Sequence, residues 1–181
     1  PRYDHRGWLW TATATGSDAF RATGYLGDSA EVLAPWIGNF QIHQFSISPE
    51  GSRIAYIASI DGTRRTYLAG IVRNRQGQPI ALTKPVQLPA AHPWPVSIAW
   101  CSPLNLLQLY RNPGDSEAIP VVLTIGGASL ELDSVTGATQ IMANTSGSSY
   151  FALTQFGEVL RYRGYNWTPF AGGVTIAHMA N

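Results

Sequence analysis

Short apolar runs, separated by turn residues, follow one another between residues 44 and 72. Apolar side chains occupy both faces of the run 54–58, and the run 67–72 repeats this two-sided pattern. Runs of about five or six such residues are typical of β-strands in a sheet that is covered on both sides. Pro49-Glu50-Gly51 and Asp61-Gly62 supply the backbone geometry of tight turns. The segment is therefore predicted to form three consecutive antiparallel strands.

A similar grouping of strands recurs along the chain. Ser48-Pro49 and Ser102-Pro103 stand at equivalent places, 54 positions apart, where the first strand of each group ends. A repeat of this length suits the four-stranded blades of a β-propeller with fairly long loops. The predicted groups are a partial blade at 1–34 and blades at 42–88, 96–133 and 138–170.

The predicted fold class is all-β: a β-propeller of four-stranded antiparallel blades, in one domain or fragment, with no helix. About three and a half blades cannot close a ring, because propellers typically have about four to eight. We therefore expect part of a larger propeller. The chain begins at Pro1 rather than at a methionine, so it is expected to be a piece of a longer protein. The alternative is that four irregular blades close a narrow ring.

The bulk composition excludes several classes of protein. Of the 181 residues, 45% are hydrophobic and 13% are charged, which indicates a folded globule rather than a disordered chain. The formal net charge of +1 argues against a nucleic-acid-binding protein. No apolar run approaches the length of a membrane span, and no signal peptide is visible.

No catalytic or metal-binding pattern stands out in the sequence. His5, His43, His92 and His178 are scattered, without the paired spacing of a metal site, and His43 is interpreted as a satisfied histidine in a strand. Cys101 is expected to be a small buried apolar residue. A nucleophile elbow and a phosphate-binding loop are both missing, while two carboxylates brought together by folding remain open as a glycosidase pair. We expect no catalytic residue, no metal and no cofactor.

Aromatic and charged residues in predicted connections suggest a binding face. In an up-and-down blade, the loop between the second and third strands opens on the same side as the connection between blades. The candidate partner-binding residues on that side are Trp36, Phe40, Asp61, Arg64, Arg65, His92 and Trp94. Aromatic residues beside arginine are typical of protein-binding hot spots. Two alternatives stay open: the tryptophans fill gaps between blades, and the arginines form a solvated edge that discourages pairing between sheets.

The segment from Ser48 to Tyr56, SPEGSRIAY, is similar to the S-P-D-G-x-x-I-A-[FY] blade motif of TolB-like propellers. Further motifs narrow the resemblance. They are Gly7-Trp8-Leu9-Trp10-Thr11-Ala12, Ala34-Pro35-Trp36, Ala69-Gly70-Ile71-Val72-Arg73 and Gly126-Gly127. Together these motifs resemble the C-terminal propeller of the actinobacterial lipoprotein LpqB family, and the resemblance runs over most of the chain.

This resemblance implies a location and a partner. The family is held outside the cytoplasmic membrane by a lipidated cysteine, which here would lie outside this chain. It is associated with the sensor kinase MtrB of the MtrAB two-component system, and so with cell-envelope homeostasis. The resemblance thus implies a non-catalytic interaction domain that binds the extracellular part of an MtrB-like kinase and modulates it.

Two other functions stay open at this point. One is a propeller that binds carbohydrate or peptidoglycan, with Trp36 and Trp94 as stacking platforms. The other is the accessory propeller of a hydrolase whose catalytic domain lies elsewhere.

Overall fold

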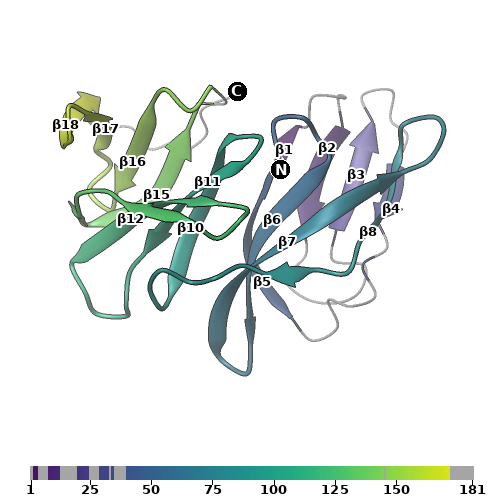
Figure 1. Ribbon diagram of the computed structural model, residues 1–181, viewed down its shortest axis with the longest axis horizontal. Helices are drawn as coiled ribbons and strands as arrows, with labels where there is room; N and C mark the ends of the chain where they lie inside the picture. The colour runs from purple at the N-terminus through teal and green to yellow at the C-terminus, as the bar shows by residue number, and fades with distance from the viewer. Residues whose placement is uncertain are drawn as a thin grey trace. The chain divides into compact units, whose positions relative to one another are not determined.

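The computed structural model describes residues 2–3, 8–12, 20–24, 29–32, 34, 40–144 and 146–171. Across these residues every regular element is a β-strand, and every strand pairing is antiparallel. The pairings group the strands into four sheets, which follow one another from purple to yellow in Figure 1. The chain divides into two compact units, Pro1–Leu88 (unit 1) and Pro89–Asn181 (unit 2), each with two sheets.

Unit 1 contains the first two sheets. The strands of the first sheet are β1 (Arg2–Tyr3), β2 (Trp8–Ala12), β3 (Phe20–Gly24) and β4 (Ser29–Val32). The strands of the second sheet are β5 (Gln41–Ile47), β6 (Arg53–Ile60), β7 (Thr63–Arg73), β8 (Pro79–Leu82) and β9 (Val86–Gln87). Successive strands are neighbours in both sheets, with β9 beside β7. Where the sequence predicted part of a blade, the first sheet has four strands, of which β1 is two residues long.

Strand β6 and the turn that follows it match the sequence pattern. Every residue between the half-buried Arg53 and Ile60 is buried, as a strand that is apolar on both faces requires. Asp61 and Gly62 then adopt φ values of 50° and 78°. Positive φ at both central residues is the geometry of the two-residue turns that join twisted strands, and glycine adopts it without strain.

The two sheets of unit 1 pack face to face. Trp10, Phe20 and Tyr56 have no exposed surface, and they belong to one cluster drawn from both sheets. The rings of Phe20 and Tyr56 lie edge to face, with their centroids 5.8 Å apart. Burial of each such side chain contributes roughly 1.5–3 kcal/mol, so these large residues hold the sheets together.

Unit 2 contains the third and fourth sheets. The strands of the third sheet are β10 (Pro95–Ser102), β11 (Asn105–Tyr110), β12 (Glu117–Thr124), β13 (Ser129–Glu131) and β14 (Val135–Thr136). The strands of the fourth sheet are β15 (Ala138–Ala143), β16 (Tyr150–Thr154), β17 (Val159–Arg163) and β18 (Asn166–Ala171). Their order is again sequential, with β14 beside β12.

A buried apolar cluster that includes several alanines joins the two sheets of unit 2. Ala118, Ala138 and Ala152 have no exposed surface and belong to one cluster, which also contains Ile141. Small side chains let the strands of one sheet approach those of the next. The backbone N–H of Ile141 donates a hydrogen bond across this contact to Ser97 Oγ, at 3.1 Å, which fixes β15 against β10.

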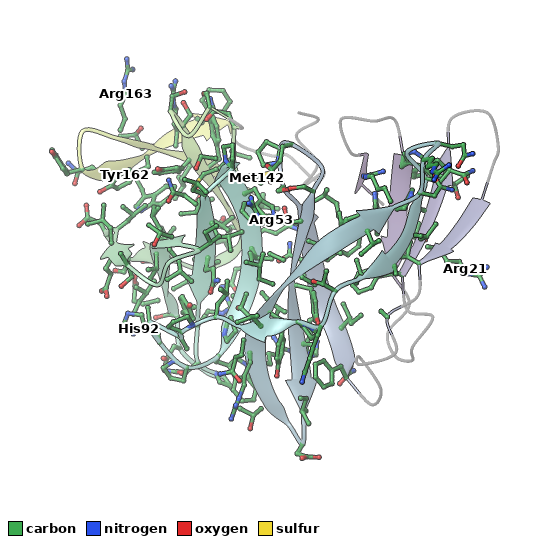
Figure 2. The ribbon with its side chains drawn as sticks, turned by 45° about the vertical axis from the view of Figure 1, so that its right-hand side comes forward. Arg21, Arg53, His92, Met142, Tyr162 and Arg163 are labelled. Carbon is green, nitrogen blue, oxygen red and sulfur yellow. The ribbon has the colours of Figure 1, made fainter. Side chains whose placement is uncertain are left out.

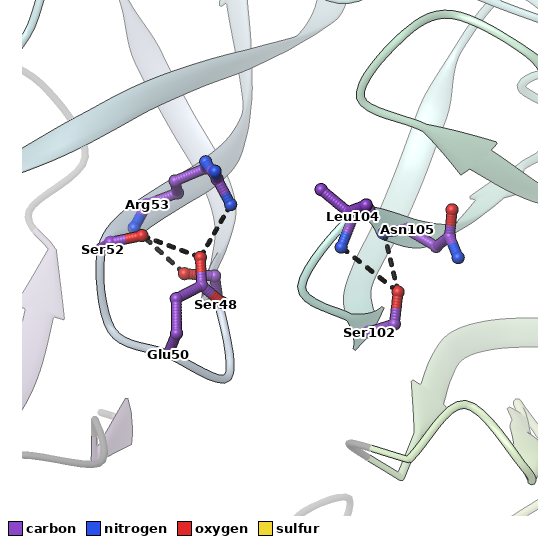
Figure 3. Close-up of polar contacts among 7 residues, drawn as sticks. All are labelled: Ser48, Glu50, Ser52, Arg53, Ser102, Leu104 and Asn105. Carbon is purple, nitrogen blue, oxygen red and sulfur yellow. Dashed lines mark hydrogen bonds and ion pairs between the residues drawn. The ribbon is translucent and has the colours of Figure 1, made fainter.

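The two Ser-Pro pairs play the same local part in their turns (Figure 3). Ser48 Oγ accepts a hydrogen bond from the backbone N–H of Arg53 at 3.0 Å. Ser102 Oγ accepts from the backbone N–H groups of Leu104 and Asn105, at 3.2 and 3.0 Å. In each case a serine at the end of a first strand caps the start of the second, which agrees with the repeat read from the sequence.

The β15–β16 turn leaves no room for a side chain at Gly147. This residue has a φ of 67°, and an added Cβ would lie 2.8 Å from the carbonyl oxygen of Cys101. Gly164 has a similar φ of 58°, but nothing would lie within 4 Å of its added Cβ. An alanine at either position would be strained by the positive φ, but only an alanine at Gly147 would also clash. Comparing the two substitutions therefore separates the destabilisation caused by backbone strain from the destabilisation caused by the clash.

We predict that Gly147→Ala lowers the free energy of unfolding by about 2 kcal/mol more than Gly164→Ala, because the carbonyl cannot move away without disturbing β10. Urea unfolding of both variants measures the difference. Equal destabilisation of the two variants would contradict the close approach at Gly147.

Candidate functional site

The structure describes six of the seven predicted binding residues, and Trp36 lies outside the described part. In unit 1, Phe40 precedes β5, Asp61 lies in the β6–β7 turn, and Arg64 and Arg65 begin β7. In unit 2, His92 and Trp94 precede β10. The residues of unit 1 gather at one end of the second sheet, because Gln41 at the start of β5 pairs with Ser59 near the end of β6.

The pleat of β7 sends its two arginines to opposite faces. Arg64 pairs with Ser59, and Arg65 pairs with Ala58, which belongs to the core cluster of unit 1. Neighbouring residues in a strand point to opposite sides. On its side of the sheet, Arg65 donates a hydrogen bond from Nη1 to Gln87 Oε1 at 2.9 Å. The two arginines therefore belong to different surfaces.

Phe40 packs on the aromatic core of unit 1. Its ring centroid lies 5.1 Å from that of Tyr67, which in turn stacks on Tyr56 at 5.5 Å. Burial raises the pKa of Tyr67 and Tyr56 above the ordinary value of 10. Phe40 is half-buried, so much of its surface serves packing.

A row of polar side chains crosses the face of the sheet that carries Arg64. Gln41, Ser59 and Arg64 occupy matching positions on β5, β6 and β7. A bulge between Ile42 and Gln44 turns His43 toward this row. The Nε2 atom of His43 lies 2.9 Å from Ser59 Oγ. The Ser59 hydroxyl donates a longer hydrogen bond, 3.5 Å, to Gln41 Oε1. We call Gln41, His43, Ser59 and Arg64 the polar row.

The polar row keeps His43 in its neutral form. Partial burial lowers the pKa of the imidazole, and the nearby Arg64 guanidinium lowers it further. Both causes oppose a second positive charge beside the arginine. At neutral pH the row therefore carries one fixed positive charge, on Arg64, and three uncharged polar groups.

The bulge is shared by other sheets, but the polar row is not. Irregular register occurs near the start of the first strand in the second, third and fourth sheets, at His43, Val96 and Thr139. In the third sheet the positions that match Gln41, Ser59 and Arg64 are Pro95, Tyr110 and Ile119. The bulge thus recurs in these three sheets, and among them only the second has a histidine at the bulge.

The sequence-predicted residues of unit 2 serve mainly internal contacts. Figure 2 labels His92, whose Nε2 lies 2.7 Å from Glu131 Oε2 on β13. Its ring also lies edge-on to Tyr110, with centroids 5.7 Å apart. Trp94 is half-buried and has a φ of 62°, and its carbonyl accepts a hydrogen bond from the Arg111 N–H at 3.2 Å.

The described residues contain neither a candidate metal-ion group nor an activated thiol. No group of three or more His, Cys, Asp or Glu side chains there could hold a metal ion. Cys101 is buried, its Sγ–H points to the Asn105 carbonyl at 3.4 Å, and burial raises the thiol pKa to about 11. Such a thiol stays protonated at neutral pH and is a poor nucleophile. The same residues include no helix that is long and apolar enough to span a lipid bilayer.

Comparison with solved structures defines the class of fold. The chain resembles a chain in the crystal structure of a nidogen/laminin complex, with a TM-score of 0.61 and 12% identity over 89% of this chain and 58% of that one. It also resembles TolB from Acinetobacter baumannii, with a TM-score of 0.55 and 16% identity over 90% of this chain and 39% of that one. The chain therefore spans well under two thirds of each. Its fold is that of part of a β-propeller, built from antiparallel sheets in which four strands follow one another in order.

The family is shown by the sequence itself. Residues 1–178 match the family described as the lipoprotein LpqB beta-propeller domain. The chain belongs to this family, as the motifs from Ser48 to Tyr56 and beyond predicted. No curated protein sequence matches it.

The polar row predicts how stability depends on pH. Because the folded state lowers the pKa of His43, the unfolded chain binds a proton more readily below about pH 6.5. The contribution of His43 to stability is complete above that pH and is lost as the pH falls through the lowered pKa. We predict that His43→Gln reduces the loss of melting temperature between pH 7.5 and pH 5.

The effect is small because the ring is partly solvated. His92→Gln, which acts on a different sheet, serves as the comparison. If His43→Gln leaves the pH profile of melting unchanged, the neutral state of His43 in the fold is contradicted.

Proposed function

We propose that this chain is a non-catalytic protein-interaction domain of an extracytoplasmic lipoprotein, and that its partner is the extracellular part of an MtrB-like sensor kinase. The observation that carries the proposal is the match of residues 1–178 to the LpqB propeller family. Through this partner the domain modulates a two-component system and cell-envelope homeostasis. The membrane is reached by a lipid anchor outside this chain, and nucleic acid is not a partner.

The geometry supports contact through the end of the second sheet. The exposed Asp61 lies in the turn just before Arg64 and Arg65. At the same end of the sheet, the half-buried Phe40 packs against Tyr67 of the aromatic core. Arginine next to a packed aromatic residue is a frequent composition of protein-binding hot spots.

The test is binding between the protein's extracytoplasmic portion and the extracellular domain of the kinase. The double variant Arg64→Gln/Arg65→Gln is expected to weaken binding about tenfold, or about 1.4 kcal/mol, because this end of the sheet loses a positive group from each of its faces, whichever face the partner meets. The double variant Arg75→Gln/Lys84→Gln removes the same charge from exposed positions elsewhere in unit 1 and is expected to bind like the wild type. Calorimetric titration measures both.

Absence of binding by the wild-type protein would refute the proposed partner. Equal weakening by both double variants would show that net charge, rather than this end of the sheet, governs the interaction.

A second function, binding of carbohydrate or peptidoglycan, is favoured by one observation. Trp94 combines a bulky side chain with a positive φ of 62°. Such backbone strain concentrates at functional positions, and a half-buried indole can stack on a sugar ring.

Under this alternative, we predict that soluble peptidoglycan fragments change the tryptophan fluorescence of the wild-type protein and that Trp94→Phe largely removes the change. Trp100→Phe, at a buried position of β10, is the matched control. A fluorescence change that survives in Trp94→Phe would contradict the stacking role.

A further inference from the structure

The outer strands of the second sheet concentrate positive charge. Five of the 12 lysine and arginine residues lie between positions 63 and 88, in β7 to β9 and their connections, and none of the 11 aspartate and glutamate residues does. The rest of the chain therefore has seven basic and 11 acidic residues. Strands β8 and β9 pair with β7, and β8 lies beside β4 (Figure 1), so this edge is built within unit 1.

Three of these five cations have no carboxylate to balance them. Among the described residues, Arg65, Arg75 and Lys84 form no ion pair, and all three side chains are exposed. The hydrogen bond of Arg65 goes to an uncharged carboxamide on β9, which leaves the charge of the guanidinium uncompensated. The other two cations, Arg64 and Arg73, take part in contacts inside the fold. Three positive charges therefore remain for an external anion.

Exposed aliphatic side chains lie between the cations. Val72, Ile80 and Val86 are 39%, 41% and 65% exposed. The pairing with β7 places Val86 between Arg65 and Lys84. The other two aliphatic residues lie between Lys84 and the β7–β8 turn. Cations and aliphatic side chains thus alternate over roughly 30 Å. We call the following residues the basic edge: Arg65, Val72, Arg75, Ile80, Lys84 and Val86.

The backbone of this edge is poorly suited to adding a strand from a partner peptide. Strand β8 has four residues and β9 has two, and Pro85, which has no backbone N–H, interrupts the edge between them. Short strands, lysine and proline are features that keep sheet edges from pairing with other chains. Contacts of the basic edge with a ligand are therefore made by its side chains.

We propose that the basic edge binds the surface of a membrane that contains anionic lipids. The cations meet the phosphate groups, and the aliphatic side chains between them reach the boundary of the acyl chains. The chain belongs to a family of lipoproteins, so a lipid surface is within reach of the domain. This contact goes beyond the proposed function, since it needs no kinase.

A membrane matches the basic edge better than an acidic protein does. Lipid head groups diffuse within the surface, so cations spread over roughly 30 Å can each find a phosphate. A protein would need carboxylates held at the same spacing, with apolar pockets between them. Long lysine and arginine side chains also keep their charged ends at the polar level of the interface, while the shorter aliphatic side chains contact its apolar level.

The first experiment measures sedimentation of the full chain with lipid vesicles. One set contains phosphatidylcholine with about 30% phosphatidylglycerol, and the other contains phosphatidylcholine alone. We expect binding to the anionic vesicles only, and loss of binding when the salt concentration rises from about 50 mM to about 300 mM. No binding to the anionic vesicles, or equal binding to both sets, would overturn the inference. Binding of soluble poly-glutamate without binding of the vesicles would assign the edge to an acidic protein and would also overturn it.

Charge variants test the position of the contact. Arg75→Gln/Lys84→Gln is expected to weaken binding to the anionic vesicles at least about tenfold, because two cations leave the edge. Arg21→Gln/Arg163→Gln removes the same charge from exposed positions on β3 and β17 (Figure 2) and is expected to bind nearly as well as the wild type. Thermal melting checks that each variant folds. Equal weakening by both double variants would attribute binding to net charge and overturn the inference.

A polarity-sensitive dye tests whether the aliphatic side chains reach the lipid, and it keeps the test valid if a charge variant does not fold. Attached at Ile80→Cys, the dye is expected to shift its emission to the blue on anionic vesicles. At Leu130→Cys, an exposed position beside Glu131 on β13, no shift is expected. Cys101 is buried and does not take the label. Any result other than a larger shift at position 80 would overturn the inference.

Vesicle binding and kinase binding are separate outcomes. Arg75→Gln/Lys84→Gln is expected to lose the vesicles and still bind the kinase domain in solution like the wild type. If the protein binds the vesicles but not the kinase domain, the membrane contact stands and the proposed partner is wrong. If it binds the kinase domain but not the vesicles, the interaction role stands and the membrane contact is wrong.

Discussion

Packing of one apolar sheet face against another is the constraint on which the rest of this structure depends. In unit 1, Trp10 and Phe20 belong to the buried cluster that joins the two sheets, and in unit 2 Leu109, Ala138 and Ala152 belong to the corresponding cluster. A strand such as β6, which is buried on both faces, cannot be stable in an isolated sheet. Neighbouring sheets are therefore a physical requirement of the sequence.

Because the middle of each central strand is packed between apolar faces, polar side chains gather near the strand ends. Within β6 the only buried polar residue is Ser59, one position before the strand ends, and it is there that the polar row forms. The bulge at His43 is available because its strand begins there, and the same irregularity at Val96 and Thr139 serves packing or a single hydrogen bond. The same bulge in the backbone thus places an imidazole in the second sheet, through His43, and a different side chain in the third and fourth sheets.

Several residues that look available in the sequence have internal roles in the fold. His92 pairs with Glu131, Arg65 donates to Gln87, and Phe40 lies against Tyr67. Their contacts join loops and outer strands to the sheets. Arg64 lies on the opposite face from Arg65, in the polar row with His43.

The sequence predicted the order of strands, the turn at Asp61-Gly62 and the family, because alternation of apolar residues and the conformational demands of glycine and proline act locally. The polar row was missed because its members come together only through pairing between strands. Gln41, Ser59 and Arg64 lie on different strands, and only the cross-strand register, which tertiary packing selects, brings them to one face.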